Sequence, residues 1–186
     1  NPNPGDEIIT APITDPGSVM PILFQNAIPT FADVDPLTMN MTPQSIEEKI
    51  TDRTRAIILV HLFGRSCNTD EVAEIAKAHG IVLIEDCSQC HATLYKGRYA
   101  GSTGDISCYS LQQSKHMTTG DGGMAVTNDE ETYLRLKLFA DKGWDYKYMG
   151  ERDHAFLAPN YRMTEMQGAV GVAQLKKVRD VTLRRI

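Results

Sequence analysis

The stretch Thr54-Arg55-Ala56-Ile57-Ile58-Leu59-Val60-His61-Leu62-Phe63-Gly64 decides the fold of this chain. It is an almost uninterrupted apolar run, which is typical of a strand buried on both faces of a parallel sheet. A second run of this kind, Ile81-Val82-Leu83-Ile84-Glu85-Asp86, comes later in the chain. Two such strands predict a sheet whose connections cross over its faces.

The segments around these runs have the pattern of helices and further strands. Residues 68–79 carry apolar residues at helical spacing and end at Gly80, and residues 42–47 open with Thr42 as a cap. Residues 29–35 alternate like a strand. Strand, helix, strand, helix and strand therefore follow one another. We expect an α/β fold with a mostly parallel central sheet flanked by helices and right-handed crossovers.

The remaining elements are predicted from the same kinds of pattern. They are a strand at 7–12, a helix at 16–26, paired strands at 104–110 and 123–128, a helix at 129–141, a surface loop at 142–159 and one long helix at 164–185. We expect the long helix to turn Met166, Val170, Ala173 and Leu175 inward.

The composition is that of an ordinary globular protein. The chain has 186 residues, 41% of them apolar and 23% charged, with a net charge of −5. A nucleic-acid-binding surface would need a basic stripe. No apolar run approaches the ~18 residues that cross a bilayer, and the first residues carry no signal pattern. We therefore expect a cytoplasmic protein without nucleic-acid or membrane partners.

One lysine lies among hydroxyl and glycine residues, in the stretch Tyr109-Ser110-Leu111-Gln112-Gln113-Ser114-Lys115-His116-Met117-Thr118-Thr119-Gly120-Asp121-Gly122-Gly123. The hydroxyl groups can donate to a phosphate, and the glycines let a ligand approach the backbone closely. The pattern is not that of a nucleotide P-loop. It predicts a phosphate site around Lys115, on a loop between two paired strands.

Asp86 ends one of the buried strands. Ligands of open parallel sheets bind outside the carboxyl ends of the strands. A carboxylate there could hydrogen-bond a pyridinium nitrogen and keep it protonated. An aspartate that caps a helix or forms a turn explains the position equally well, so both interpretations stay open on spacing alone.

Several motifs, in order along nearly the whole chain, resemble those of the DegT/DnrJ/EryC1/StrS family of pyridoxal-phosphate-dependent sugar aminotransferases, which have fold type I. The motifs are Gly5-Asp6-Glu7-Ile8-Ile9-Thr10, Ile84-Glu85-Asp86-Cys87-Ser88-Gln89, Gly101-Ser102-Thr103-Gly104-Asp105-Ile106, the lysine stretch, and Asn160-Tyr161-Arg162-Met163-Thr164-Glu165-Met166-Gln167.

The resemblance implies a role for each matching residue. Lys115 would hold pyridoxal phosphate (PLP) through an imine and later shuttle a proton, and Asp86 would pair with the pyridine nitrogen. Gln89 would reach the phenolic oxygen, and Ser110 the phosphate. Many family members have an aromatic residue near this part of the chain that stacks on the ring, whereas residues 14–17 here include none. Ser88 is expected to contact the ring instead. Asn160 matches an asparagine that reaches the phosphate in the neighbouring subunit of a homodimer with shared active sites.

The resemblance also implies a reaction and a domain plan. An amino acid, glutamate or glutamine, would give its amino group to a keto-sugar, which we expect to be nucleotide-linked, or to a keto-cyclitol. The Gln112-Gln113-Ser114-Lys115 version resembles members that act on either kind of acceptor. Family chains begin before this one and continue past it. We therefore expect a partial chain: residues 1–160 as the central part of the large PLP-binding domain, and 161–186 as a helix leading toward a small C-terminal domain.

Two alternatives remain. One is a catalytically incompetent fragment that acts only in PLP binding or oligomerisation. The other is a thiol or zinc site at Cys87 and Cys90, which form a C-x-x-C pair. Cys67 and Cys108 are isolated, whereas a zinc site wants a second pair. We expect two reduced cysteines here and no metal site.

Overall fold

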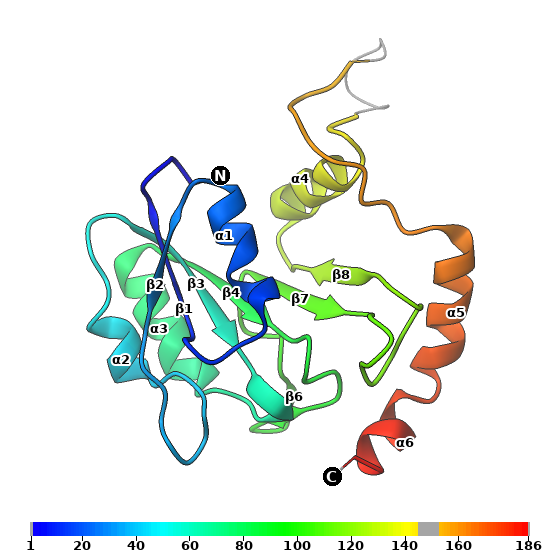
Figure 1. The fold of residues 1–186 in the computed structure, drawn as a ribbon, viewed down its shortest axis with the longest axis horizontal. Coiled ribbons are helices and arrows are strands. Elements are labelled where there is room, and N and C mark those ends of the chain that lie inside the picture. Colours follow the sequence, from blue (N-terminus) through cyan, green and yellow to red (C-terminus); the bar gives the residue numbers. More distant parts are fainter. Residues whose placement is uncertain (1, 145–152, 186) are drawn as a thin grey trace.

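A six-stranded sheet forms the centre of the computed structural model, which describes residues 2–144 and 153–185 (Figure 1). Its order is β2 (Ile28–Phe31), β1 (Glu7–Thr10), β3 (Thr54–Val60), β4 (Val82–Asp86), β7 (Ile106–Ser110) and β8 (Gly123–Val126). Neighbouring strands are parallel except β7 and β8. The mostly parallel sheet is therefore confirmed, as is the hairpin whose loop carries Lys115. A separate two-stranded sheet joins β5 (Leu94–Tyr95) and β6 (Arg98–Tyr99).

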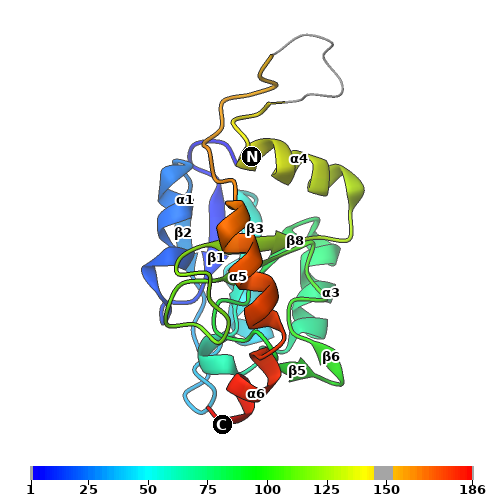
Figure 2. The ribbon, with the colours of Figure 1, turned by 90° about the vertical axis from the view of Figure 1, so that its right-hand side faces the viewer.

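Helices cover both faces of the sheet, and Figure 2 shows α1 and α3 on opposite sides of it. The helices are η1 (Pro16–Ser18), α1 (Met20–Phe24), α2 (Pro43–Glu47), η2 (Leu62–Gly64), α3 (Thr69–His79), α4 (Glu130–Ala140), α5 (Glu165–Leu175) and α6 (Val178–Leu183). The Thr42 side chain accepts from Ser45 N–H at the start of α2, and Gly80 ends α3 at φ +64°. Both boundaries agree with the sequence prediction. No helix in the described residues is long and apolar enough to cross a membrane.

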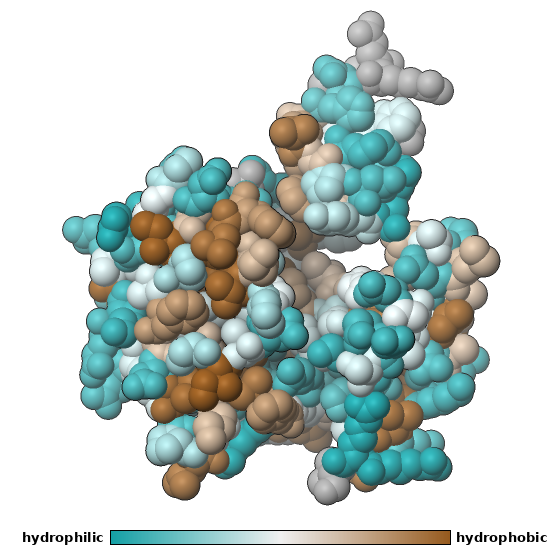
Figure 3. Space-filling model, in the orientation of Figure 1, coloured by the Kyte–Doolittle hydropathy of each residue, from teal (hydrophilic) through white to brown (hydrophobic). Residues whose placement is uncertain are grey.

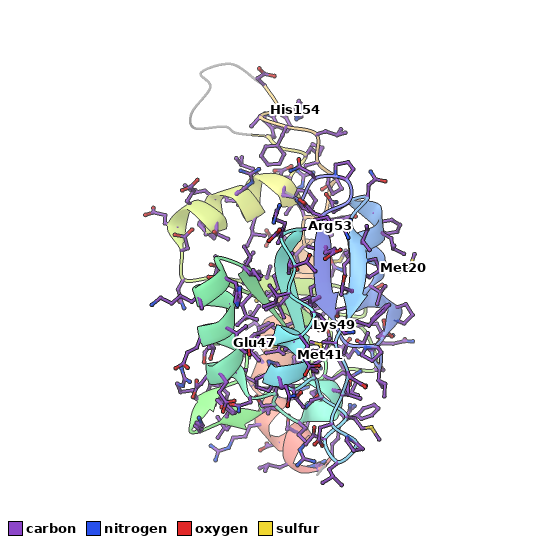
Figure 4. All side chains as sticks on the ribbon, turned by 90° about the vertical axis from the view of Figure 1, so that its left-hand side faces the viewer. Met20, Met41, Glu47, Lys49, Arg53 and His154 are labelled. Carbon is purple, nitrogen blue, oxygen red and sulfur yellow. The ribbon has the colours of Figure 1, made fainter. Side chains whose placement is uncertain are left out.

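The two faces of the sheet are covered unequally. The larger core lies on the side of α2 and α3 and includes Ile9, Ile57, Leu59 and Val72. The core under α1 is small and is built around Ile8 and Ile22. β3 is buried on both faces as predicted, but Val82 of β4 is 43% exposed. At the amino end of β1, Arg53 (labelled in Figure 4) pairs with Glu7.

The single long helix predicted at 164–185 is wrong. It is divided into α5 and α6, because Lys177 N–H bonds to the Gln174 carbonyl three residues back and tightens the last turn of α5. The inward stripe is also wrong, because Met166, Val170, Ala173 and Leu175 are all exposed. α5 buries its glycine side instead, through Gly171.

Other boundaries differ by a few residues. The helix predicted at 16–26 is split into η1 and α1, with Pro21 in the first turn of α1. The strand predicted at 29–35 is the shorter β2. Part of the predicted loop at 142–159 falls outside the described residues. The space-filling view shows an opening between α4 and α5, over the exposed strand β8 (Figure 3).

Candidate functional site

The carboxyl ends of β4 and β7 place the predicted site residues at one edge of the sheet. Asp86 is the last residue of β4, and its parallel pairing partner, Cys108, comes two residues before Ser110 at the end of β7. The loop that follows Ser110 carries Lys115. This is the edge at which open parallel sheets bind their ligands.

Two hydrogen bonds fix the carboxylate of Asp86. Its Oδ2 accepts from the Ser18 hydroxyl over 2.6 Å, and its Oδ1 accepts from Ser88 N–H over 3.0 Å. Ser18 is buried at the end of η1, and its hydroxyl lies 2.8 Å from that of Thr14. Ser18 is not among the site residues predicted from the sequence. The one feature of the sequence that could have indicated it is its position in the connection after β1. Because β1 runs parallel to β4, this connection begins at the same edge of the sheet as Asp86.

Gln89 lies in the turn that follows Asp86. Its Oε1 accepts from Phe63 N–H over 2.7 Å. The backbone of Phe63 has φ +52°, which is unusual for a bulky residue, and its side chain is exposed. Because the oxygen of Gln89 is engaged, its amide NH₂ group is the part that can bind a ligand oxygen.

The lysine loop is held by its own backbone. Lys115 N–H bonds to the Gln112 carbonyl over 3.0 Å, and Thr119 N–H bonds to the Leu111 carbonyl over 2.9 Å. Gly120 and Gly122 have φ of +87° and +143°. Lys115 is partly buried, and its Nζ makes no hydrogen bond or ion pair with any residue that the structure describes. A partly buried amine without a partner is suited to bind an added group.

The two C-terminal helices contact this loop. Gln167 Nε2 of α5 donates to the Asp121 carbonyl over 3.0 Å, and Arg185 Nη1, just after α6, donates to the Ser114 carbonyl over 3.1 Å. Neither contact was predictable from a local pattern, because each joins segments that are far apart in the chain. These two contacts hold the loop on either side of Lys115.

His91 connects the turn after Asp86 to the lysine loop. Its Nε2 donates to the Ser110 carbonyl over 2.8 Å, and its ring centre lies 5.5 Å from that of His116. Burial lowers the pKa of His91, and the charges of His116 and Lys115 lower it further, against the effect of the Ser110 bond. Burial also lowers the pKa of His116, together with the charges of Arg185 and Lys115. Two neutral imidazoles therefore lie beside Lys115 near pH 7.

Glu85 supports the site from inside the fold. Its fully buried carboxylate accepts from the N–H groups of Gly101, Thr103 and Gly104, over 2.6–2.9 Å, and contacts His61 Nε2 at 2.9 Å. Burial raises the pKa of Glu85, but these bonds outweigh it, so the pKa is lowered and the group stays ionised. The loop at 101–104 is thereby fixed to the end of β4.

Five of the six candidate residues share this edge: Asp86, Ser88, Gln89, Ser110 and Lys115. The Ser110 hydroxyl accepts from Gln112 N–H over 3.3 Å. Asn160 is exposed, forms a bridge with Asp141, and makes no hydrogen bond with the other five. The role of each residue toward a cofactor stays a prediction.

Two cavities of the described surface lie at the opposite end of the strands. One, of about 410 Å³, is lined by residues that include Thr54 and Ile81. The other, of about 800 Å³, is lined by residues that include Val82, Ile106 and Phe139. Neither contains a candidate residue.

Comparisons with known proteins give close matches. The profile of the DegT/DnrJ/EryC1/StrS aminotransferase family matches residues 1–186. GDP-perosamine synthase from Escherichia coli O157:H7 is 41% identical over 181 residues, which cover 97% of this chain and 49% of that protein.

Solved structures match equally well. The crystal structure of an aminotransferase from Psychrobacter cryohalolentis is 41% identical, with a TM-score of 0.90 over 96% of this chain and 47% of that one. The PLP form of Spr1654 from Streptococcus pneumoniae is 28% identical, with a TM-score of 0.86 over 96% of this chain and 50% of that one. The chain thus has the fold of type I aminotransferases, and it spans about half the length of the relatives it matches.

Proposed function

The chain belongs to the DegT/DnrJ/EryC1/StrS aminotransferase family, and from this premise we propose that it is the cofactor-binding part of a PLP-dependent enzyme that moves an amino group from an amino acid to a keto-sugar. The proposed donor is glutamate or glutamine. The proposed acceptor is a nucleotide-linked keto-sugar, which agrees with the similarity to GDP-perosamine synthase, or else a keto-cyclitol. The similarity to the PLP form of Spr1654 supports the cofactor.

One observation carries this proposal: a partly buried amine without a partner, Lys115 Nζ, shares a sheet edge with a carboxylate held by two hydrogen bonds, Asp86. His91 joins the two segments through Ser110 and His116. An amine, a fixed carboxylate and a glycine-rich turn are the groups that PLP needs. The residues present therefore fit the cofactor.

When bound, PLP supplies an electron-withdrawing ring that stabilises negative charge on the reacting carbon. Asp86 would accept a hydrogen bond from the ring nitrogen and hold its proton there, and Gln89 would donate to the ring oxygen. Lys115 Nζ would attach the cofactor and, once released from it, carry the proton between reacting carbons.

Further residues complete the proposed site. The hydroxyl of Ser110 would bind the phosphate, together with the backbone around Gly120 and Gly122, and Ser88 would contact the ring. Asn160 would bind the phosphate in the active site of a second subunit, and we therefore propose a homodimer with shared active sites. We also propose that the protein is cytoplasmic. We also propose that residues 1–160 are the central part of a large domain and that 161–186 lead to a smaller one.

Transfer of labelled nitrogen tests the proposal. The chain is incubated with PLP, ¹⁵N-labelled glutamate or glutamine, and a nucleotide-linked keto-sugar or keto-cyclitol, and the acceptor is analysed by mass spectrometry. We expect an acceptor that has gained labelled nitrogen, loss of transfer in Lys115→Ala, and no change in the exposed control Lys49→Ala (Figure 4). A chain that binds PLP but transfers no nitrogen to any acceptor would instead support the alternative of a binding domain.

A further inference from the structure

Two buried thiols lie within the turn that carries Ser88 and Gln89. Cys87 is 0% exposed and Cys90 is 2% exposed. Cys90 N–H bonds to the Cys87 carbonyl over 3.1 Å, which closes a four-residue turn. Their sulfur atoms lie within 4.8 Å of each other. A turn of this kind brings the Cα atoms within 7 Å, and disulfides span about 4.4–6.8 Å between Cα atoms.

A third residue, His61, lies within the same 4.8 Å and completes the one group of potential metal ligands among the described residues. Both of its ring nitrogens are already engaged. Nδ1 accepts from Cys67 N–H over 3.2 Å, and Nε2 contacts Glu85 at 2.9 Å. A nitrogen that binds a metal must keep a free lone pair. The imidazole therefore has none to offer, and two thiolates alone are too few ligands for a closed zinc site.

The two thiols are electrically unequal. The Cys90 thiol and His61 lower the pKa of Cys87 to about 6, against the effect of burial. The nearby Cys87 raises the pKa of Cys90, and burial adds to this. Cys87 is thus the more acidic thiol of the pair, and Cys90 the less acidic. This division is found in pairs made of an attacking and a resolving thiol.

We propose that Cys87 and Cys90 form a dithiol site that a hydroperoxide oxidises to a disulfide across the turn between Asp86 and His91. The Cys87 sulfur attacks the peroxide oxygen, the O–O bond breaks, and the sulfenic acid and one hydroxide form. The Cys90 sulfur then attacks the sulfenic sulfur and displaces its hydroxyl group. Overall the two thiols lose two protons and two electrons, and hydrogen peroxide becomes two waters.

The surroundings of the two sulfurs limit which oxidant can reach them and explain why Cys67 and Cys108 do not take part. Because both sulfurs are buried, bulky disulfides such as oxidised glutathione cannot reach them in the folded chain. Hydrogen peroxide, a molecule near water in size, needs only a small local opening of the turn to reach them. Burial and the charge of Asp86 raise the pKa of Cys108 to about 11, so its thiol stays protonated. The Cys67 thiol donates to the Val60 carbonyl over 3.1 Å and belongs to the larger core, whereas Cys87 and Cys90 form a separate buried cluster with Ala100.

Thiol mapping of the folded chain tests this site. The chain is treated with hydrogen peroxide, its free thiols are alkylated under denaturing conditions, and its peptides are identified by mass spectrometry. We expect one product in which Cys87 and Cys90 are joined and Cys67 and Cys108 are alkylated. This product is two hydrogens lighter, and dithiothreitol under denaturing conditions restores the two thiols. Oxidised glutathione should give no product with the folded chain.

Variants extend the test. Cys108→Ser should leave the disulfide unchanged. Cys90→Ser should stop oxidation at sulfenic acid on Cys87, detected with dimedone that is added as the oxidised chain is denatured. Three results would overturn the proposal: a disulfide that includes Cys67 or Cys108, no loss of free thiols in the folded wild-type chain, or stoichiometric zinc that protects both sulfurs. The wild-type map decides even where a variant does not fold, and it needs no PLP.

Discussion

The hydroxyl of Ser18 donates to Asp86 Oδ2 over 2.6 Å and joins the loop after β1 to the end of β4, although the two residues are 68 positions apart. The only other hydrogen bond to this carboxylate among the described residues comes from Ser88 N–H. Ser18 therefore helps to fix the direction in which Asp86 presents its oxygens.

Ser18→Ala should weaken PLP binding about tenfold, because a hydrogen bond to a charged group is worth about 1.5–3 kcal/mol and part of this is regained from water. The dissociation constant is measured by visible absorbance. Ser102→Ala is the control, because its hydroxyl donates only to the Tyr99 carbonyl in an exposed loop. Equal affinities in Ser18→Ala and wild type would show that Asp86 needs no such support.

Glu85→Gln should destabilise the fold by about 2–4 kcal/mol. The carboxylate accepts three backbone N–H bonds and contacts His61, and an amide can replace one oxygen but turns an NH₂ group toward the remaining donors. Urea unfolding gives the free energy. Glu48→Gln, at an exposed position that accepts from Gln44, is the matched control and should change it by less than about 0.5 kcal/mol.

Glu85 should also make stability fall in acid. Its pKa is lowered in the fold, since its bonds outweigh burial, whereas in the unfolded chain it titrates near 4.5. Above that pH both states are ionised and the stabilisation is complete. As the pH falls below it, the unfolded chain takes up a proton first and stability is lost. Urea midpoints between about pH 6 and pH 3.5 should therefore fall more steeply in wild type than in Glu85→Gln. If the urea midpoints of wild type and Glu85→Gln fell equally with pH, the loss of stability in acid would come from other carboxylates.

Two glycines of α5 should respond differently to alanine. A Cβ at Gly168 meets nothing within 4 Å, so Gly168→Ala should stabilise the chain by about 0.5–1 kcal/mol through helix propensity. A Cβ at Gly171 would lie 3.3 Å from Thr119 Cγ2 and 3.7 Å from Met117 Cε, so Gly171→Ala should lose most of this gain. Urea unfolding measures both. Equal gains would argue against close packing of α5 on the lysine loop.

Patterns within a short stretch predicted much of this molecule. The apolar run at 54–60 predicted β3. Thr42 predicted the start of α2, and Gly80 predicted the end of α3. Asp86 lies at the end of a buried strand as expected. Each of these depends on neighbouring residues and on the period of a helix or strand. The same reasoning placed Lys115 on the hairpin loop.

Contacts between distant segments were not predictable in this way. The bond from Ser18 to Asp86 and the bond from Arg185 to Ser114 depend on the complete fold. The apolar side of α5 suggested burial, yet Met166 and Leu175 are exposed because nothing in the described chain packs against them. Hydrophobic spacing shows that a face exists, and it does not show what covers it.

Lys115 is the residue that we propose holds PLP. The most direct test of this role is to mix the chain with PLP, reduce with borohydride, digest, and locate the pyridoxyl group by mass spectrometry. We expect the group on the peptide that contains Lys115, at about one per chain, and its loss in Lys115→Ala. A pyridoxyl group on other lysines in wild type, or an unchanged yield in Lys115→Ala, would contradict the account.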